Sequence, residues 1–242
     1  MKKLLIIMSA WIAVFCAYSF AGELFDDFLT DEVDEDAWWV KTTGNATAEI
    51  KNGELILSSH DVPGSIYLLY KEAIPPGEPI TVEIRMNLQA NPNDGWFGFL
   101  KDFPGDSHVN TVINDLKDAT MFFVSGGGGQ VQPRGEGGAR GGNVNIKVEE
   151  FHIFKIEITD TKYRIEVDDK EVLDGSRDDG IYTNRAIYIA PDGFDSHYEN
   201  ASFVVDWIRL SGPTIPQRLI AVDALWKLPI VWGKVKQGWP GN

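Results

Sequence analysis

Three acidic residues, Glu166, Asp168 and Glu171, have a spacing that could support acid–base chemistry. They belong to the stretch YRIEVDDKEVLDG. Glycoside hydrolysis commonly uses two carboxyl groups, which lie about 5–5.5 Å apart in retaining enzymes and farther apart in inverting ones. The spacing therefore raises the hypothesis that this stretch is a catalytic strand.

The residues around these acids favour a surface hairpin instead. Ile165 and Val167 alternate with polar residues, which predicts a strand with one buried face. The Asp168-Asp169 pair that follows is typical of a turn, and a second short apolar run returns after it. Alternation puts Glu171 on the opposite face from Glu166, so only a bulge would join them. We expect the hairpin to keep the two carboxyls too far apart for a retaining mechanism.

Most of the chain consists of short apolar runs separated by turn signals. Val82, Ile84 and Met86 in ITVEIRMNL share one face of a predicted strand, and Asn52-Gly53 is a strong hairpin signal. Similar runs include SIYLLY, WFGFL, ATMFFV, FHIFKIEI, RAIYIA and SFVVDWIRL. About ten such strands and no long helix before residue 212 predict an all-β fold, an antiparallel two-sheet jelly-roll sandwich.

The first 21 residues have the three parts of a secretory signal peptide. Two lysines precede an apolar run at residues 4–15, and a small-x-small cleavage site occupies residues 19–21. The apolar run is shorter than the roughly 20 residues that span a bilayer. Lipid attachment through Cys16 is disfavoured because the bulky Phe15 stands where such signals need a small residue. We therefore expect a secreted or periplasmic protein.

Composition narrows the classes of partner. The net charge is −14, which disfavours nucleic acid and anionic lipid and leaves neutral sugars, cations or proteins. Cys16 is the single cysteine and lies in the predicted signal peptide. The exported domain, residues 22–212, therefore has no disulfide, thiolate metal site or cysteine nucleophile, and its own core must hold it together.

Two segments depart from the strand pattern. Residues 126–142 contain nine glycines together with Arg134 and Arg140, which indicates a long mobile loop or a flap over a binding face. Residues 213–242 form a tail in which apolar residues recur at helical spacing until Pro229. This partly helical tail either packs on its own domain or docks a protein partner, and the pattern leaves both open.

Four stretches together resemble the concanavalin A-like lectin and glucanase superfamily, which includes laminin-G-like domains and lichenase-type β-glucanases. They are LFDDFLTDEVDEDAWW, AEIKNGELILSS, FHIFKIEITDTKYRIEVDDKEVLD and FVVDWIRLSG, and the resemblance covers roughly residues 25–212. It implies a jelly roll with one concave sheet that often holds glycan.

The resemblance also implies where glucanase acids should lie, on a central strand near ATMFFVSGGGG. No carboxylate occurs between Thr120 and Ser125. The nearby acids Asp102, Asp106, Asp115 and Asp118 stand in loop-like sequence without the motif. The glucanase machinery is therefore expected to be missing, although another pair of acids could serve.

A structural calcium ion is a further implication of the resemblance. Many of these jelly rolls bind calcium through an aspartate of the closing strand and carbonyls near the first hairpin. Asp206 in VVDWIRL and Gly53 in NGELIL match these positions. Calcium takes six to eight oxygen ligands, so two matches define a hypothesis.

Aromatic and cationic residues complete the candidate binding site. Trp96 begins a predicted strand and could stack on a sugar ring, Tyr198 is a second loop aromatic, and Arg134 and Arg140 could bind a ligand from the glycine-rich segment. We therefore expect an exported, non-catalytic carbohydrate-binding domain. The alternatives are a glycoside hydrolase with a non-standard acid pair and a cell-surface structural or adhesion protein.

Overall fold

The computed structural model describes residues 22–30, 32–42, 44–59, 66–75, 77–89, 95–100, 119–125, 129–177, 186–190, 201–216 and 218–220 of the 242-residue chain. The predicted signal peptide and residues 221–242 of the tail, including the helical pattern there, lie outside these ranges. Within them, no helix is long and apolar enough to cross a membrane.

The described strands form two sheets, as predicted. Sheet A has nine strands: β1 (Gly22–Asp26), β3 (Thr47–Lys51), β4 (Glu54–Ser59), β6 (Ile80–Leu88), β11 (Phe151–Ile158), β12 (Lys162–Val167), β13 (Lys170–Ser176), β15 (Ala201–Gly212) and β16 (Arg218–Ile220). Sheet B has seven: β2 (Trp38–Thr42), β5 (Ile66–Tyr70), β7 (Trp96–Leu100), β8 (Thr120–Ser125), β9 (Gln130–Arg134), β10 (Val144–Asn145) and β14 (Ala186–Ala190).

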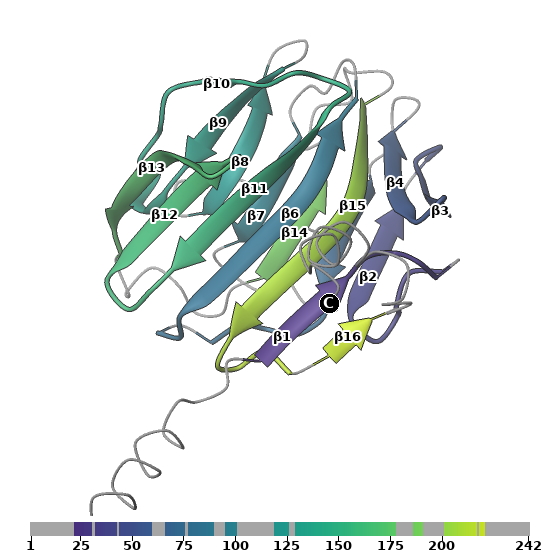
Figure 1. The fold of residues 1–242 in the computed structure, drawn as a ribbon, viewed down its shortest axis with the longest axis horizontal. Coiled ribbons are helices and arrows are strands. Elements are labelled where there is room, and N and C mark those ends of the chain that lie inside the picture. Colours follow the sequence, from purple (N-terminus) through teal and green to yellow (C-terminus); the bar gives the residue numbers. More distant parts are fainter. Residues whose placement is uncertain are drawn as a thin grey trace, which may run out of the picture.

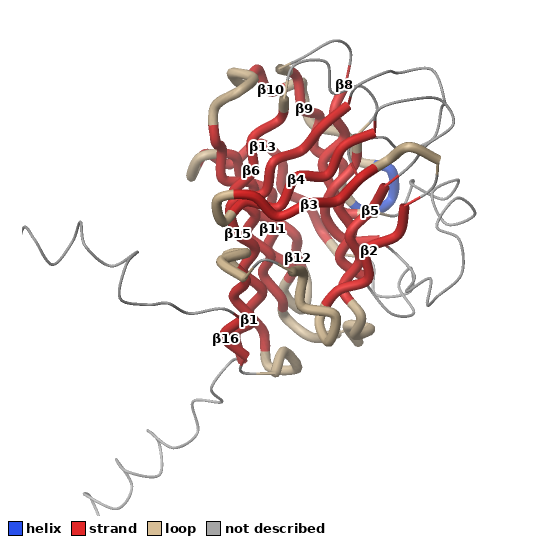
Figure 2. Tube along the Cα trace, turned by 90° about the vertical axis from the view of Figure 1, so that its right-hand side faces the viewer, coloured by secondary structure: helices blue, strands red, loops and turns tan. Residues whose placement is uncertain are grey.

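The two sheets stack face to face. Sheet A has the order β13-β12-β11-β6-β15-β1-β16, and its strands face the viewer in Figure 1. Sheet B has the order β10-β9-β8-β7-β14-β5-β2 and lies behind. Figure 2 shows the two layers from the side. The pairing is antiparallel throughout except between β1 and β16.

Alternation along each strand builds the core between the sheets. In β6, Val82, Ile84 and Met86 are buried on the predicted face. The centre of the core is aromatic: the Phe97 ring lies 4.8 Å from that of Phe154 and 5.9 Å from that of Phe203. Because Phe97 belongs to sheet B and the other two to sheet A, these contacts join the layers.

Two tight turns confirm the predicted hairpins. Asn52 and Gly53 have φ values of 57° and 75° and join β3 to β4. Asp168 and Asp169 have φ values of 50° and 61° and join β12 to β13. Positive φ at both central residues is typical of the two-residue turns that match strand twist.

The glycine-rich segment corrects the prediction of a long loop. Residues 130–134 form β9, which pairs with β8, and Val131 and Pro133 are buried on its inner side. The peptide N–H of Gly141 donates to the carbonyl of Pro133 at 3.0 Å. Five residues of this segment therefore belong to sheet B, because the alternating apolar side chains of Val131 and Pro133 outweigh the local glycine content.

The chain continues to contribute to the fold after residue 212. β16 pairs in parallel with β1, and Leu219 stands opposite Phe25. Sheet A therefore includes three residues of the segment that the sequence assigns to a tail.

Candidate functional site

The outer face of sheet B carries a second cluster of apolar side chains, separate from the core. Strand alternation explains it, because Phe97 and Phe99 of β7 point inward while Trp96 and Leu100 point outward. Its buried members are Leu69, Trp96, Leu100, Ala119, Met121, Tyr188 and Ala190, and Trp39, Tyr67 and Phe123 are partly exposed. The last three are the aromatic surface that a ligand could contact.

Phe123 is the best-supported aromatic residue of this face. Its ring centroid lies 4.4 Å from that of Trp96, with the planes inclined by 37°. The guanidinium carbon of Arg134 lies 5.4 Å from the Phe123 centroid. Trp96 is only 8% exposed, so it supports Phe123 from beneath more than it presents a surface of its own.

A row of amide side chains continues the face beyond Phe123. Gln132 stands opposite Phe123, and Gln130 stands opposite Asn145. The side-chain Nε2 of Gln130 donates to Asn145 Oδ1 at 3.3 Å, and Gln130 Oε1 accepts from Asn143 Nδ2 at 3.1 Å. Because each amide carries both donors and acceptors, the row can bind sugar hydroxyls while it keeps its internal bonds.

Two arginines close this end of the face. Arg134 and Arg140 stand opposite each other in an isolated antiparallel bridge. Arg134 is half-buried and Arg140 is exposed. Burial, followed by repulsion from Arg140, lowers the pKa of Arg134 below its ordinary value. The guanidinium of Arg134 therefore lies beside the Phe123 ring, and the charge of Arg140 is close enough to act on it.

Gly98 leaves the centre of the face without a side chain. It stands between Tyr188 of β14 and Met121 of β8, and its φ is +136°. A Cβ atom there would lie 2.7 Å from the Met121 Cα and 2.8 Å from Ile156 Cδ1. Only glycine fits where these backbones and the core approach so closely.

Aromatic side chains also occupy the opposite end of the face. The Tyr67 and Tyr188 rings lie 5.6 Å apart. Lys71 Nζ lies 5.6 Å from the centroid of Trp39. This end therefore also combines partly exposed rings with a cation.

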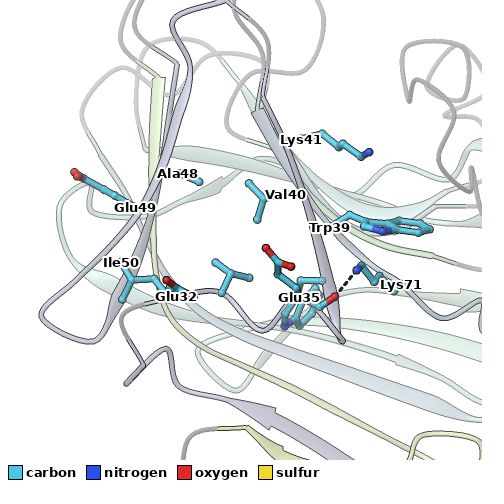
Figure 3. A pocket seen from close by; sticks show the side chains of 11 residues that line it. Glu32, Glu35, Trp39, Val40, Lys41, Ala48, Glu49, Ile50 and Lys71 are labelled. Atoms are coloured by element: carbon cyan, nitrogen blue, oxygen red, sulfur yellow. Dashed lines mark hydrogen bonds between the residues drawn. The ribbon is translucent and has the colours of Figure 1, made fainter.

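A cleft of about 730 Å³ opens between β2 and β3, at the edge of the sandwich. Figure 3 shows Val40, Ala48 and Ile50 along its walls. Its other lining residues are Glu32, Val33, Glu35, Trp38, Trp39, Lys41, Glu49 and Lys71. Figure 3 shows Glu35 pointing into the cleft and Glu49 pointing away from it, so the glutamates do not converge on one position.

The acids of the hairpin lie on the other sheet. A register shift after Ile165 places Glu166 opposite Glu171, so the bulge that alternation required is present. Arg164 hydrogen-bonds Glu166, and its Nε lies 3.7 Å from Glu171 Oε2. Lys155 Nζ lies 3.6 Å from Glu166 Oε2. The sequence predicted that the hairpin would keep these two acids far apart, but they stand directly opposite each other. Cationic side chains on the outer face of sheet A neutralise both.

Asp168 has a structural role in the same hairpin. It accepts a hydrogen bond from the peptide N–H of Ile153 at 3.0 Å, and its second oxygen lies 2.7 Å from His152 Nδ1. These contacts fix the turn against β11.

The matched calcium positions are neighbours in sheet A. Asp206 follows Val205, which stands opposite Leu55 just after the Gly53 turn. The Asp206 carboxylate forms an ion pair with Arg85. Among the described residues, no three His, Cys, Asp or Glu side chains gather to hold a metal ion. The hypothesis relies on backbone carbonyls as well as Asp206, so this does not test it, and calcium at Asp206 stays a prediction.

The structure brings three of the four predicted carbohydrate-binding residues to one face. Trp96, Arg134 and Arg140 lie together at the β7–β8–β9 end of sheet B. Tyr198 lies outside the described residues, as do Asp102, Asp106, Asp115 and Asp118. On the described part of this face, alternation places no Asp or Glu, and β8 presents Met121 and Phe123 there.

Sequence reasoning missed Phe123 as a surface residue and overlooked the amides. The signal was the alternation in QVQPR, which puts Gln130, Gln132 and Arg134 on one side. The surrounding glycines concealed it.

No family model matches the sequence, and no curated protein shows detectable sequence similarity to it. Solved structures do resemble it. The carbohydrate recognition domain of Emp47p superposes with a TM-score of 0.56 at 16% identity and covers 81% of this chain and 98% of its own. The laminarinase from Flavobacterium sp. UMI-01 has a TM-score of 0.55 at 15% identity and covers 77% and 98%.

A third similar structure is the endo-β-1,3-glucanase from Pyrococcus furiosus, with a TM-score of 0.55, 16% identity and coverage of 78% and 92%. At these identities the comparisons establish the fold alone. The concanavalin A-like jelly roll that the sequence predicted is confirmed, and the same fold occurs in a carbohydrate recognition domain, a laminarinase and an endo-β-1,3-glucanase.

Proposed function

We propose that this chain is a non-catalytic carbohydrate-recognition domain that binds polysaccharide on the outer face of sheet B. The observation that carries the proposal is the row formed by Phe123, Gln132, Gln130 and Asn145, in which a partly exposed ring adjoins amides on one face of the sheet. A carbohydrate recognition domain with the same fold gives independent support.

The row supplies the two interactions that sugar binding needs. The apolar face of a pyranose ring stacks on Phe123, which Trp96 holds in place by packing at 4.4 Å. The hydroxyls at the ring edge then exchange hydrogen bonds with Gln130, Gln132 and Asn145.

One assay separates binding from hydrolysis. The full chain is incubated with a panel of soluble and insoluble polysaccharides, and retention and new reducing ends are measured in the same tubes. The proposal expects retention without new reducing ends. Retention by no polysaccharide, or retention always accompanied by new ends, contradicts it.

A glycoside hydrolase is the second candidate. Two observations favour it: the glucanases among the similar structures, and Glu35, which points into the cleft beside Trp39. If the cleft is catalytic, Glu35→Gln abolishes the release of reducing ends. If acids at residues 102–118 are catalytic instead, Glu35→Gln leaves the release unchanged and substitutions at those acids stop it.

We also propose that the protein is exported and that its C-terminal tail contacts a protein partner. Cleavage after residue 21 predicts a secreted or periplasmic protein whose new N-terminus is Gly22, which N-terminal sequencing of exported protein would detect. An adhesive role through residues 213–242 predicts that deletion of residues 221–242 removes a protein partner while polysaccharide retention remains.

A further inference from the structure

The arrangement of Arg134 and Arg140 differs from that of other arginines on the two sheets. On the outer face of sheet A, Arg85 pairs with Asp206 and Arg164 pairs with Glu166. Arg209 Nη1 likewise lies 3.1 Å from Glu83 Oε2. Within the described part of the chain, neither Arg134 nor Arg140 has an acidic partner.

Two like charges opposite each other in a sheet are destabilising unless something compensates them. Arg134 adds a second cost, because it is half-buried and its Nε has no hydrogen-bond partner within the described residues. Its contact with the Phe123 ring offsets only part of this cost. A bound anion would offset both the repulsion between the arginines and the missing hydrogen bond of Arg134, so the pair has the features of an anion-binding site.

The negative net charge of the whole chain strengthens the case that Arg134 and Arg140 bind an anion. A chain with 36 acidic and 22 basic residues carries a net charge of −14 and has many carboxylates with which to neutralise two arginines. On the described outer face of sheet B, strand alternation instead places only uncharged or cationic residues beside them. A local positive field on a negative molecule attracts a specific anionic group while the rest of the surface repels nonspecific polyanions.

We propose that the polysaccharide bound by the outer face of sheet B is anionic, and that Arg134 and Arg140 bind its carboxylate or sulfate groups. A guanidinium donates two parallel hydrogen bonds to either group. Phe123 stacks on the same sugar unit, and Gln130 and Gln132 bind its hydroxyls. This inference rests on the proposed function, because it names the ligand class of the same face.

Matched polymers isolate the effect of charge. Dextran is compared with dextran sulfate, and highly methyl-esterified pectin with polygalacturonate, so that each pair shares a backbone. Dissociation constants are measured by calorimetry at about 0.15 M salt, where the Debye length is near 8 Å. The sulfated and carboxylated members separate the two sources of negative charge.

Full-length wild type is compared with the double variant Arg134→Gln/Arg140→Gln and with Arg209→Gln. Arg209 is the matched control, because it also stacks on aromatic rings, 5.3 Å from Phe25 and 5.4 Å from Trp207, but on the other sheet and with acidic partners. Melting curves confirm that each variant is folded.

We expect at least one charged polymer to bind about tenfold more tightly than its neutral counterpart. The double variant should bind that polymer about ten- to a hundredfold more weakly, since hydrogen bonds to charged groups are being removed, and Arg209→Gln should bind as wild type does. Equal binding of charged and neutral polymers, or an unchanged double variant, overturns this inference and leaves the proposed function standing. Binding to no polysaccharide at all overturns both.

Discussion

The carboxylate of Asp26 in sheet A accepts a 2.9 Å hydrogen bond from the indole Nε1 of Trp38 in sheet B. Both side chains are buried, and the other Asp26 oxygen accepts from the peptide N–H of Phe28 at 3.0 Å. Burial is the main cause that raises the pKa of Asp26 from 3.8 to about 6; Asp34 and Asp27 add to the rise, and the two hydrogen bonds oppose it.

The raised pKa of the buried Asp26 predicts that the stability of the fold depends on pH. The folded carboxyl holds its proton more tightly than the unfolded one, so the stabilisation is complete below pH 3.8 and is lost as the pH rises through about 6. A rise of this size corresponds to roughly 3 kcal/mol in the free energy of unfolding. Urea unfolding at pH 4 to 7 measures it.

Asp26→Asn is the control for that measurement, because every other carboxylate remains. The difference between wild type and variant in the free energy of unfolding should change by roughly 2 kcal/mol between pH 4 and pH 7, because part of the effect already lies below pH 4. Parallel curves for the two proteins would show that Asp26 titrates normally in the folded state.

Gly98→Ala should destabilise the fold by roughly 2 to 4 kcal/mol, since it adds both steric overlap and an unfavourable φ. The new Cβ would lie 2.7 Å from the Met121 backbone. Gly142→Ala is the matched control, because no atom lies within 4 Å of its Cβ position. Denaturant midpoints measure both, and equal midpoints would contradict the close approach at Gly98.

Calcium at Asp206 would have to compete with the guanidinium of Arg85. We therefore expect calcium to raise the melting temperature of chelator-treated Arg85→Met more than that of wild type, and Asp206→Asn to abolish the rise. No rise in either of the first two proteins, or the same rise in Asp206→Asn, would remove calcium from this site.

The hairpin acids are expected to be structural. Glu166 is buried and paired with Arg164 and Lys155, so Glu166→Gln should lower the melting temperature. Polysaccharide retention should not change, because this hairpin belongs to sheet A. Loss of retention or of any hydrolysis in Glu166→Gln, at temperatures where the variant is folded, would instead give the hairpin a functional role.

The sequence predicted the sandwich because its main signals are local. Alternation in ITVEIRMNL and the turn at Asn52 and Gly53 need no distant contact to be interpreted. The strand at residues 130–134 was missed because glycines and Pro133 indicate a loop. Proline is tolerated there because Pro133 lies beyond the part of β9 that pairs with β10, and its carbonyl still accepts a hydrogen bond from Gly141.

The site was less predictable, since it depends on neighbours that meet only in the folded sheet. Trp96 and Phe123 stand opposite each other on neighbouring strands, and only packing shows that Phe123 is the more exposed ring. The register of Glu166 and Glu171 likewise depends on a bulge that alternation does not predict.

Phe123 is the aromatic residue on which polysaccharide binding by the outer face of sheet B depends most, so its replacement tests that binding directly. Phe123→Ala and Phe151→Ala are compared for retention on the polysaccharide that wild type binds best. Phe151 is the matched control, because the guanidinium carbon of Arg85 lies 4.5 Å from its ring centroid, on sheet A. Relative to wild type, we predict about tenfold weaker retention for Phe123→Ala and unchanged retention for Phe151→Ala. Equal retention by the two folded variants would contradict binding on the outer face of sheet B.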